Sequence, residues 1–140
     1  MPDEQVTRSV DLEADVDEVW RAVADPGERA LWLDDPDAAA RRVRVDEVDA
    51  GDAADHGRRL TWTWWHPGDE GAASTVSVVL APLAGGGTRV VVTESLPARP
   101  PAVRAQAGAR ATVALVGQWC HRLLGLELLF VAARAGAVAV

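Results

Sequence analysis

Lysine, isoleucine, asparagine and tyrosine are all absent from this sequence of 140 residues, and cysteine occurs only once. All 14 basic residues are therefore Arg, and the 21 acidic residues bring the formal net charge to −7 at pH 7. This balance argues against a nucleic-acid-binding domain, which usually carries a basic surface. The single Cys120 excludes an intramolecular disulfide and fits a reducing compartment, so we expect a cytoplasmic protein.

Long uncharged apolar runs are also missing. Residues 1–4 include two acidic side chains and do not resemble the apolar core of a signal peptide. The last third of the chain is apolar, but polar and charged residues interrupt it, namely His121, Arg122, Glu127 and Arg134. A membrane-spanning helix needs about 18 or more uncharged apolar residues, so no membrane span is expected.

The overall composition is typical of a globular protein, with 49% hydrophobic and 25% charged side chains. A chain of this length is expected to form one domain, residues 1–140. The unusual feature is six Trp residues beside a single Phe. Their positions in the predicted strands and helices decide what they can do.

The N-terminal third predicts a strand followed by two short helices. Residues 5–13 alternate in character, as in a strand. Asp15 is a predicted N-cap with Glu18 three residues later, and apolar residues then follow at helical spacing: Val16, Val19, Trp20 and Val23. A second helix starts at Asp25-Pro26 with Glu28 near its start, and Leu31 and Trp32 are its expected apolar face.

The rest of the chain predicts strands over residues 41–48, 58–66, 74–82 and 88–95, then a long helix over about 102–134. Glycines 85–87 are expected to form a hairpin turn rather than a phosphate-binding loop, because no helix follows them. Strands and helices are segregated along the chain, which indicates an α+β fold. One face of the long helix carries Trp119, Leu123, Leu126 and Phe130.

Several segments together resemble the START-like, or SRPBCC, superfamily, in particular the branch of Hsp90 ATPase activator homologues. The N-terminal match covers residues 6–10 and 17–26, and Leu31-Trp32 lies where that branch has a Trp. The later matches are a strand at 59–64, a hairpin at 74–78 and 86–94, and a Gly-Trp pattern in the final helix at 117–123.

This resemblance implies a helix-grip fold, in which a curved antiparallel sheet wraps around a long C-terminal helix and a cavity lies between them. Members bind lipids, polyketides or other apolar molecules, and some are polyketide cyclases. The resemblance therefore implies an apolar small-molecule ligand. No cofactor is expected.

The strand and helix phases select the residues that would face such a cavity. Trp62 and Trp64 share a strand face with Leu60, and indole rings suit an apolar ligand that has one polar group. Ordinary core packing is the alternative interpretation for these rings. The predicted ligand-binding residues are Trp62, Trp64, Val78, Val92, Glu94, Trp119 and Leu123.

Glu94 is the one acidic residue in the second half of the chain that lies in phase with this apolar face, alongside Val90 and Val92. A carboxylate on an apolar face needs partners, which are either a ligand group, an Arg such as Arg44 or Arg89, or solvent at the strand end. Glu94 and His66 are the catalytic candidates of an alternative hypothesis, a cyclase or dehydratase.

Expectations about metal ions and partners also follow from the sequence. The three His residues, 56, 66 and 121, do not have the spacing of metal ligands, so no metal site is expected. His121 is expected to face away from the sheet. A third hypothesis is a chaperone-linked or other protein-interaction module, in which the apolar residues 135–140 contact a partner. The chain is expected to be a monomer or a homodimer.

Overall fold

The computed structural model describes residues 5–33, 41–49, 57–68, 71, 73–96 and 109–138, with the side chains of the last helix described over 116–131. The first elements are β1 (Gln5–Leu12), α1 (Val16–Ala24) and α2 (Pro26–Leu33). Strands β2 (Arg42–Asp49), β3 (Arg58–Trp65), β4 (Ser74–Pro82) and β5 (Thr88–Ser95) follow, and then helix α4 (Ala109–Val138).

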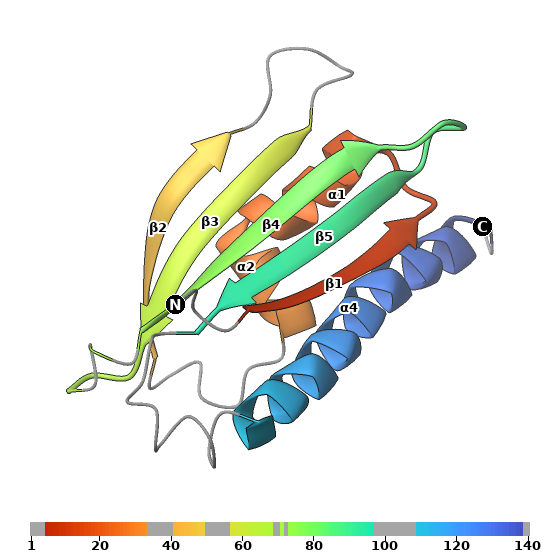
Figure 1. The fold of residues 1–140 in the computed structure, drawn as a ribbon. Helices are drawn as coiled ribbons and strands as arrows, with labels where there is room; N and C mark the ends of the chain where they lie inside the picture. Colours follow the sequence, from red (N-terminus) through yellow and green to blue (C-terminus); the bar gives the residue numbers. More distant parts are fainter. Residues whose placement is uncertain are drawn as a thin grey trace.

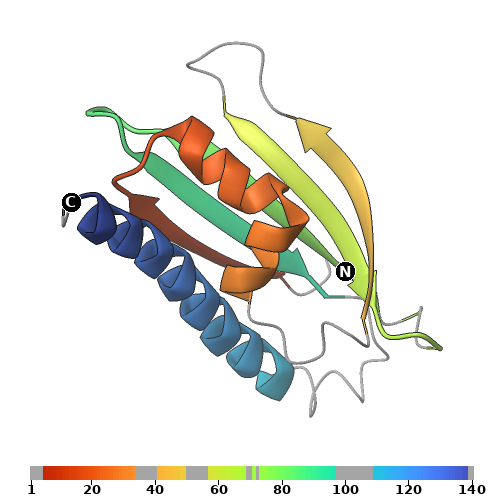
Figure 2. The same cartoon turned by 180° about the vertical axis from the view of Figure 1, so that it is seen from behind.

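The five strands form one antiparallel sheet in the order β1-β5-β4-β3-β2. The first strand pairs with the last, so that Val6 opposes Glu94 and Leu12 opposes Thr88. All three helices cover the same face of this curved sheet, with α4 running beside β1 (Figures 1 and 2). The α+β helix-grip fold predicted from the sequence is therefore confirmed.

The core lies between this inner face and the helices. Alternate residues of β3, β4 and β5 are buried, as a sheet with one solvated face requires. The predicted face of α4 is confirmed too, with Phe130 at its margin and three residues fully inside: Trp119, Leu123 and Leu126. Within the described residues α4 extends to Val138, four residues past the predicted end, and positions 102–108 lie outside them.

Both predicted helix caps are confirmed. The carboxylate of Asp15 accepts a hydrogen bond from the backbone N–H of Glu18 at 2.9 Å, and that of Asp25 accepts one from the N–H of Glu28 at 3.0 Å. These bonds satisfy N–H groups that have no partner within the helix. The sequence of each helix start therefore determined where the helix begins.

The prediction that Leu31 and Trp32 form one apolar face of α2 is wrong for Leu31, which is 68% exposed. Consecutive residues point about 100° apart on a helix, so only one of the two can face the core. Trp32 takes that place because its Nε1 donates to the carbonyl of Ala22 at 3.0 Å. Helix α4 packs closely here, since a Cβ added at Gly125 would lie 3.5 Å from the Trp32 carbonyl oxygen.

The glycine turn between β4 and β5 is confirmed as a hairpin. Gly85 and Gly86 have φ angles of 94° and 97°, a region that residues with a Cβ rarely adopt. The N–H of Leu83 donates to the carbonyl of Gly87 at 2.8 Å and closes the turn. No helix among the described residues is long and apolar enough to span a membrane.

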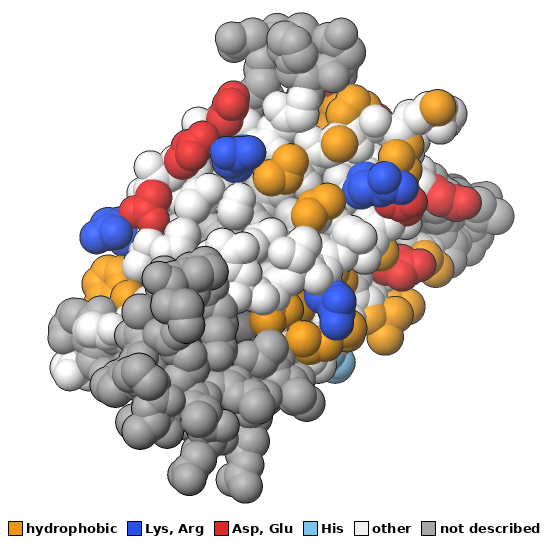
Figure 3. Space-filling model, viewed as in Figure 1, with side chains coloured by type: hydrophobic (Ala, Val, Ile, Leu, Met, Phe, Trp, Pro, Cys, Tyr) orange, Lys and Arg blue, Asp and Glu red, His pale blue; other side chains and the backbone are white. Residues whose placement is uncertain are grey.

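The outer face of the sheet is polar and carries separate ion pairs (Figure 3). Arg89 donates to both carboxylate oxygens of Asp11 at 2.8 and 3.1 Å, and Arg44 donates to Asp46 at 2.7 Å. The predicted pairing of Arg44 or Arg89 with Glu94 is therefore wrong. Both Arg residues lie on the outer face, whereas Glu94 lies on the inner one.

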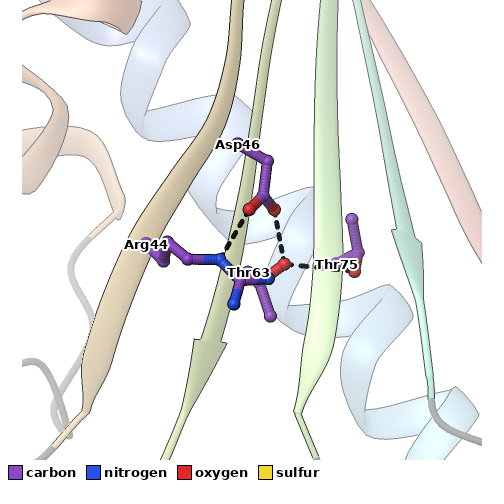
Figure 4. Close-up of polar contacts among 4 residues, drawn as sticks. All are labelled: Arg44, Asp46, Thr63 and Thr75. Carbon is purple, nitrogen blue, oxygen red and sulfur yellow. Dashed lines mark hydrogen bonds and ion pairs between the residues drawn. The ribbon is translucent and has the colours of Figure 1, made fainter.

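Asp46 occupies a β-bulge that joins β2 to its neighbours. The register of β2 against β3 shifts between Val45 and Glu47, so Asp46 is the extra residue. Besides the bond from Arg44, its carboxylate accepts a bond from Thr63 Oγ1 at 2.5 Å, and Thr63 Oγ1 lies 3.4 Å from Thr75 Oγ1 (Figure 4). The hydrogen bonds from Thr63 and Arg44 lower the pKa of Asp46.

This lowered pKa predicts a pH-dependent contribution to stability. A carboxylate whose pKa is lower in the folded state stabilises that state above its unfolded pKa, near 3.9, and loses the effect as the pH falls through the folded value. Asp46→Asn should therefore reduce the free energy of unfolding at pH 7 and have a smaller effect at pH 2, measured by urea denaturation. Thr63→Val should reduce the same pH dependence. An Asp46→Asn effect of equal size at both pH values would contradict the assignment.

The cap of α1 gives a second prediction. Asp15→Ala removes the acceptor of the Glu18 N–H and should lower the free energy of unfolding by about 1 kcal/mol. Asp15→Asn keeps an acceptor oxygen and should stay close to the wild type. Chemical denaturation of the three proteins at pH 7 compares them, and an Asp15→Ala protein as stable as the wild type would count against the cap.

Candidate functional site

The candidate site lies where the ends of β3, β4 and β5 meet α4. Glu94, near the end of β5, opposes Val76 of β4 and Val6 of β1, so its side chain emerges on the inner face. It is only 3% exposed. The alternation of residues along β5 thus places a carboxylate inside the core, as the sequence predicted.

The carboxylate of Glu94 is held by three donors from three different elements. Its Oε2 accepts bonds from Trp64 Nε1 of β3, at 2.9 Å, and from Ser74 Oγ of β4. Its Oε1 accepts a bond from Trp119 Nε1 of α4 at 2.9 Å. A buried carboxylate is costly unless such bonds satisfy it, so this arrangement ties α4 to the middle of the sheet.

The three predicted Trp residues form one aromatic cluster around this carboxylate. The rings of Trp62 and Trp64 meet edge to face with centroids 5.6 Å apart, and those of Trp64 and Trp119 stack at 6.4 Å. Their side chains are 1%, 4% and 1% exposed, respectively. Because the rings contact one another and are hidden from solvent, they form a packed layer at this point.

Arginine side chains lie over the faces of these rings. The guanidinium carbon of Arg122 lies 4.7 Å from the Trp119 centroid and 5.4 Å from that of Trp64, and Arg41 lies 4.3 Å from Trp64. Cations over indole faces are attracted by the ring quadrupole. Arg29 lies 5.4 Å from the Trp62 centroid, and burial lowers the pKa of its guanidinium.

Sequence reasoning missed Arg122, which is buried and whose Nε donates to the carbonyl of Leu33 at 3.0 Å. In the sequence Arg122 only interrupts an apolar run. A signal existed, because Arg122 lies three residues after Trp119 and four before Leu126, on the buried face of the helix. A charged residue on the buried face of a helix predicts that its side chain has a hydrogen-bond partner in the core.

The structure places all seven predicted ligand-binding residues in the interior. Trp64, Glu94 and Trp119 are joined by hydrogen bonds, whereas two others, Val78 and Val92, oppose each other further along the sheet. Leu123 lies one turn after Trp119. Whether these residues contact a ligand remains a prediction.

The catalytic candidate His66 is exposed just after β3. In the described part of the chain no hydrogen bond or ion pair joins it to Glu94. His121 is exposed as expected, and His56 lies outside the described residues. Among the described side chains no group of three or more His, Cys, Asp and Glu could hold a metal ion.

A second feature is an apolar ledge on the inner face of β2, which consists of Val43, Val45 and Val48. These side chains are 51%, 47% and 60% exposed, and they oppose three buried residues of β3, namely Trp64, Trp62 and Leu60. The helices pack against β1, β3 and β4, so the sheet is wider than its helical cover. The alternation of Val with charged residues in 42–49 was the available signal for this ledge.

A hollow of about 340 Å³ lies elsewhere, between the end of β1 and the second half of α4. Acidic and apolar side chains line it: Asp11, Leu12, Glu13, Glu127, Phe130 and Val131. None of the predicted ligand-binding residues belongs to it. The Asp11 carboxylate at its edge already accepts both bonds from Arg89.

The sequence matches no protein-family model and no curated protein sequence. Solved structures, however, share its fold. DynU16, a protein of the dynemicin biosynthetic locus, is 27% identical with a TM-score of 0.61, over 92% of this chain and 48% of DynU16. This chain therefore corresponds to about half the length of DynU16.

Two further structures resemble the chain over most of both lengths. Protein MLL2253 from Mesorhizobium loti is 22% identical, with a TM-score of 0.62 over 91% of this chain and 96% of its own. CalU16 from Micromonospora echinospora is 19% identical, with a TM-score of 0.57 over 90% and 73%. At these identities the likeness concerns the fold alone, and it agrees with the helix-grip architecture of this chain.

The buried carboxylate gives a prediction about stability. Glu94→Gln replaces one acceptor oxygen by an NH₂ group, which would leave the indole N–H of either Trp64 or Trp119 facing a donor without a bond. The variant should lose about 2–3 kcal/mol of the free energy of unfolding, measured by urea denaturation. Glu127→Gln on the exposed side of α4 is the control and should change stability by less than about 0.5 kcal/mol. Equal effects of the two substitutions would contradict the role given to Glu94.

Proposed function

We propose that this chain is a binding domain for an apolar small molecule, which lies against the inner face of the sheet where β2 extends beyond the helices. The observation that carries the proposal is the apolar ledge of Val43, Val45 and Val48. These exposed valines lie next to the buried Trp62 and Trp64 on the same face of the sheet. Exposed apolar surface beside an aromatic layer is a common setting for a ligand.

Trp62 adds a polar group to this surface. Its Nε1 is buried and has no hydrogen-bond acceptor among the described residues, and Trp62 as a whole is only 1% exposed. A buried donor without an acceptor costs about 1–3 kcal/mol. A ligand carbonyl or hydroxyl oxygen would satisfy it, so the favoured ligand has an apolar body and at least one acceptor oxygen.

The comparisons support the same class of function without naming a ligand. DynU16 belongs to a biosynthetic locus, and the resemblance of this sequence to START-like proteins implies lipids, polyketides or similar apolar molecules. The specific branch of Hsp90 ATPase activator homologues, and with it a chaperone-linked role, rests on the sequence segments alone.

Binding is favoured over catalysis because of how Glu94 is used. A cyclase or dehydratase would need an acid or base that reaches the substrate. The Glu94 carboxylate is instead surrounded by three protein donors, and His66 is exposed at the end of β3. The cyclase alternative therefore lacks a group in the described residues that is poised for proton transfer.

Binding can be measured by tryptophan fluorescence. Titration with a flavonoid, naringenin, and with a fatty acid, palmitate, should quench or shift the emission with saturation for at least one of them. Val45→Asp places a carboxylate on the ledge, which must be desolvated under the ligand, and should raise the Kd about tenfold or more. Circular dichroism checks that the variant is folded.

Val131→Asp is the matched control, because it makes the same change beside the hollow between β1 and α4. It should leave the Kd unchanged. Loss of binding in Val131→Asp but not in Val45→Asp would move the site to that hollow and overturn the proposal. Absence of saturable binding by either probe to the wild type would also contradict it.

A further inference from the structure

Strand β2 forms one edge of the sheet and β1 forms the other (Figures 1 and 2). It pairs with β3 along one side, and in the described part of the chain no strand pairs with its other side. All eight of its residues are exposed. An edge of this length presents a row of backbone N–H and C=O groups that can accept another strand.

The charges of β2 are arranged so that the strand complements itself. Its sequence has Arg at positions 42 and 44 and acidic residues at 47 and 49. If two copies run antiparallel, with position 42 opposite position 49, then Arg42 faces Asp49 and Arg44 faces Glu47. Val43 then faces Val48. Opposite charges and β-branched pairs across strands both stabilise a sheet.

Symmetry normally forbids this register in a regular strand. A two-fold axis perpendicular to a sheet maps each face of the sheet onto itself. Two residues that oppose each other across the axis must therefore lie on the same face. Arg42 and Asp49 are seven residues apart and would lie on opposite faces of a regular strand. Self-pairing in this register therefore needs one extra residue in the middle of the strand.

The β-bulge supplies this residue. The register shift between Val45 and Glu47 leaves Asp46 as the extra position, in the centre of the strand. As a result, the charged residues in both halves of β2 lie on the same face of the sheet, as their pairing partners in β3 show. The outer face carries Arg42, Arg44, Glu47 and Asp49, and the inner face carries Val43 and Val48.

The bulge is fixed by side-chain contacts from within the same chain. The carboxylate of Asp46 is held by Arg44 and by Thr63 of β3, and the hydroxyl of Thr63 lies next to that of Thr75 on β4 (Figure 4). The single chain therefore already has the self-complementary conformation of β2. Binding would order few additional groups, which favours association.

We infer that β2 pairs with β2 of a second copy of this chain, so that the two five-stranded sheets form one continuous antiparallel sheet across a two-fold axis. The two-fold axis then passes between the bulges of the two copies, where Val45 stays on the inner face and Asp46 keeps its contacts with Arg44 and Thr63 of its own chain. Arg42 and Asp49 of each copy make the two outermost charge pairs. The inference concerns the edge of β2 and does not depend on a ligand.

Sedimentation velocity over a range of protein concentrations tests this inference with two single substitutions. Arg42→Glu places two acidic residues opposite each other in the homodimer, and Asp49→Arg places two basic ones. Each should raise the Kd for dimerisation about tenfold or more. When the two variants are mixed, Glu at 42 faces Arg at 49 and the remaining Asp49 faces Arg42, so a heterodimer should form with an affinity near that of the wild type.

The double variant Arg42→Glu/Asp49→Arg should dimerise alone, because both charges of each pair are exchanged. Glu127→Arg on α4 is the control for a change of charge and should dimerise like the wild type. High salt should weaken the wild-type dimer, since exposed charges are screened. Fluorescence titrations with the same probes on the monomeric variants separate the two proposals, because loss of dimerisation need not abolish binding.

Three outcomes would overturn the inference. One is a wild-type protein that stays monomeric up to about 0.5 mM. The Kd for dimerisation would then be too high for a specific interface. Another is a dimer that both single variants leave intact, which would assign the contact to another surface, such as the exposed leucines 124 and 128 of α4. Failure of the mixed variants to associate, when each is folded, would exclude the antiparallel register.

Discussion

Burial of the Glu94 carboxylate is the constraint on which the packing of this domain depends. An ionised group in the core is expensive to desolvate, and the cost is offset only when hydrogen bonds satisfy its oxygens. Here the donors come from β3, β4 and α4, so three elements must meet at one place for the carboxylate to be stable. Such a requirement selects one position of the long helix against the sheet, because apolar contacts alone tolerate sliding far better than directional bonds do.

The second organising feature is a mismatch between the width of the sheet and that of its cover. The helices are anchored over β1, β3 and β4, and β2 extends beyond them with every residue exposed. An uncovered outer strand has two distinct surfaces, its apolar inner face and its backbone edge. The proposed ligand contact uses the first and the proposed second copy uses the second, so both follow from a sheet that its own helices do not fully cover.

Much of this fold follows from local sequence signals. The helix starts at Asp15 and Asp25, the glycine turn after Leu83 and the alternation along β3 to β5 were all predictable, because each depends on residues within a few positions of one another. The errors occurred where local signals allowed two answers. Leu31 and Trp32 were equally apolar, and which of them faces inward depends on helix α4, far along the chain.

The sequence by itself determined on which side of its strand or helix each of Trp62, Trp64 and Trp119 lies, and that Glu94 shares the apolar face, since strand and helix periods are properties of the backbone. Only the tertiary structure decided that Trp64 and Trp119, 30 and 25 residues from Glu94, both donate to it, and that Arg122 lies over their rings. Likewise, the charges of β2 could be read in order, but their faces could not, because a bulge forms against a neighbouring strand. Contacts between distant segments depend on how the elements pack, and no local pattern encodes that.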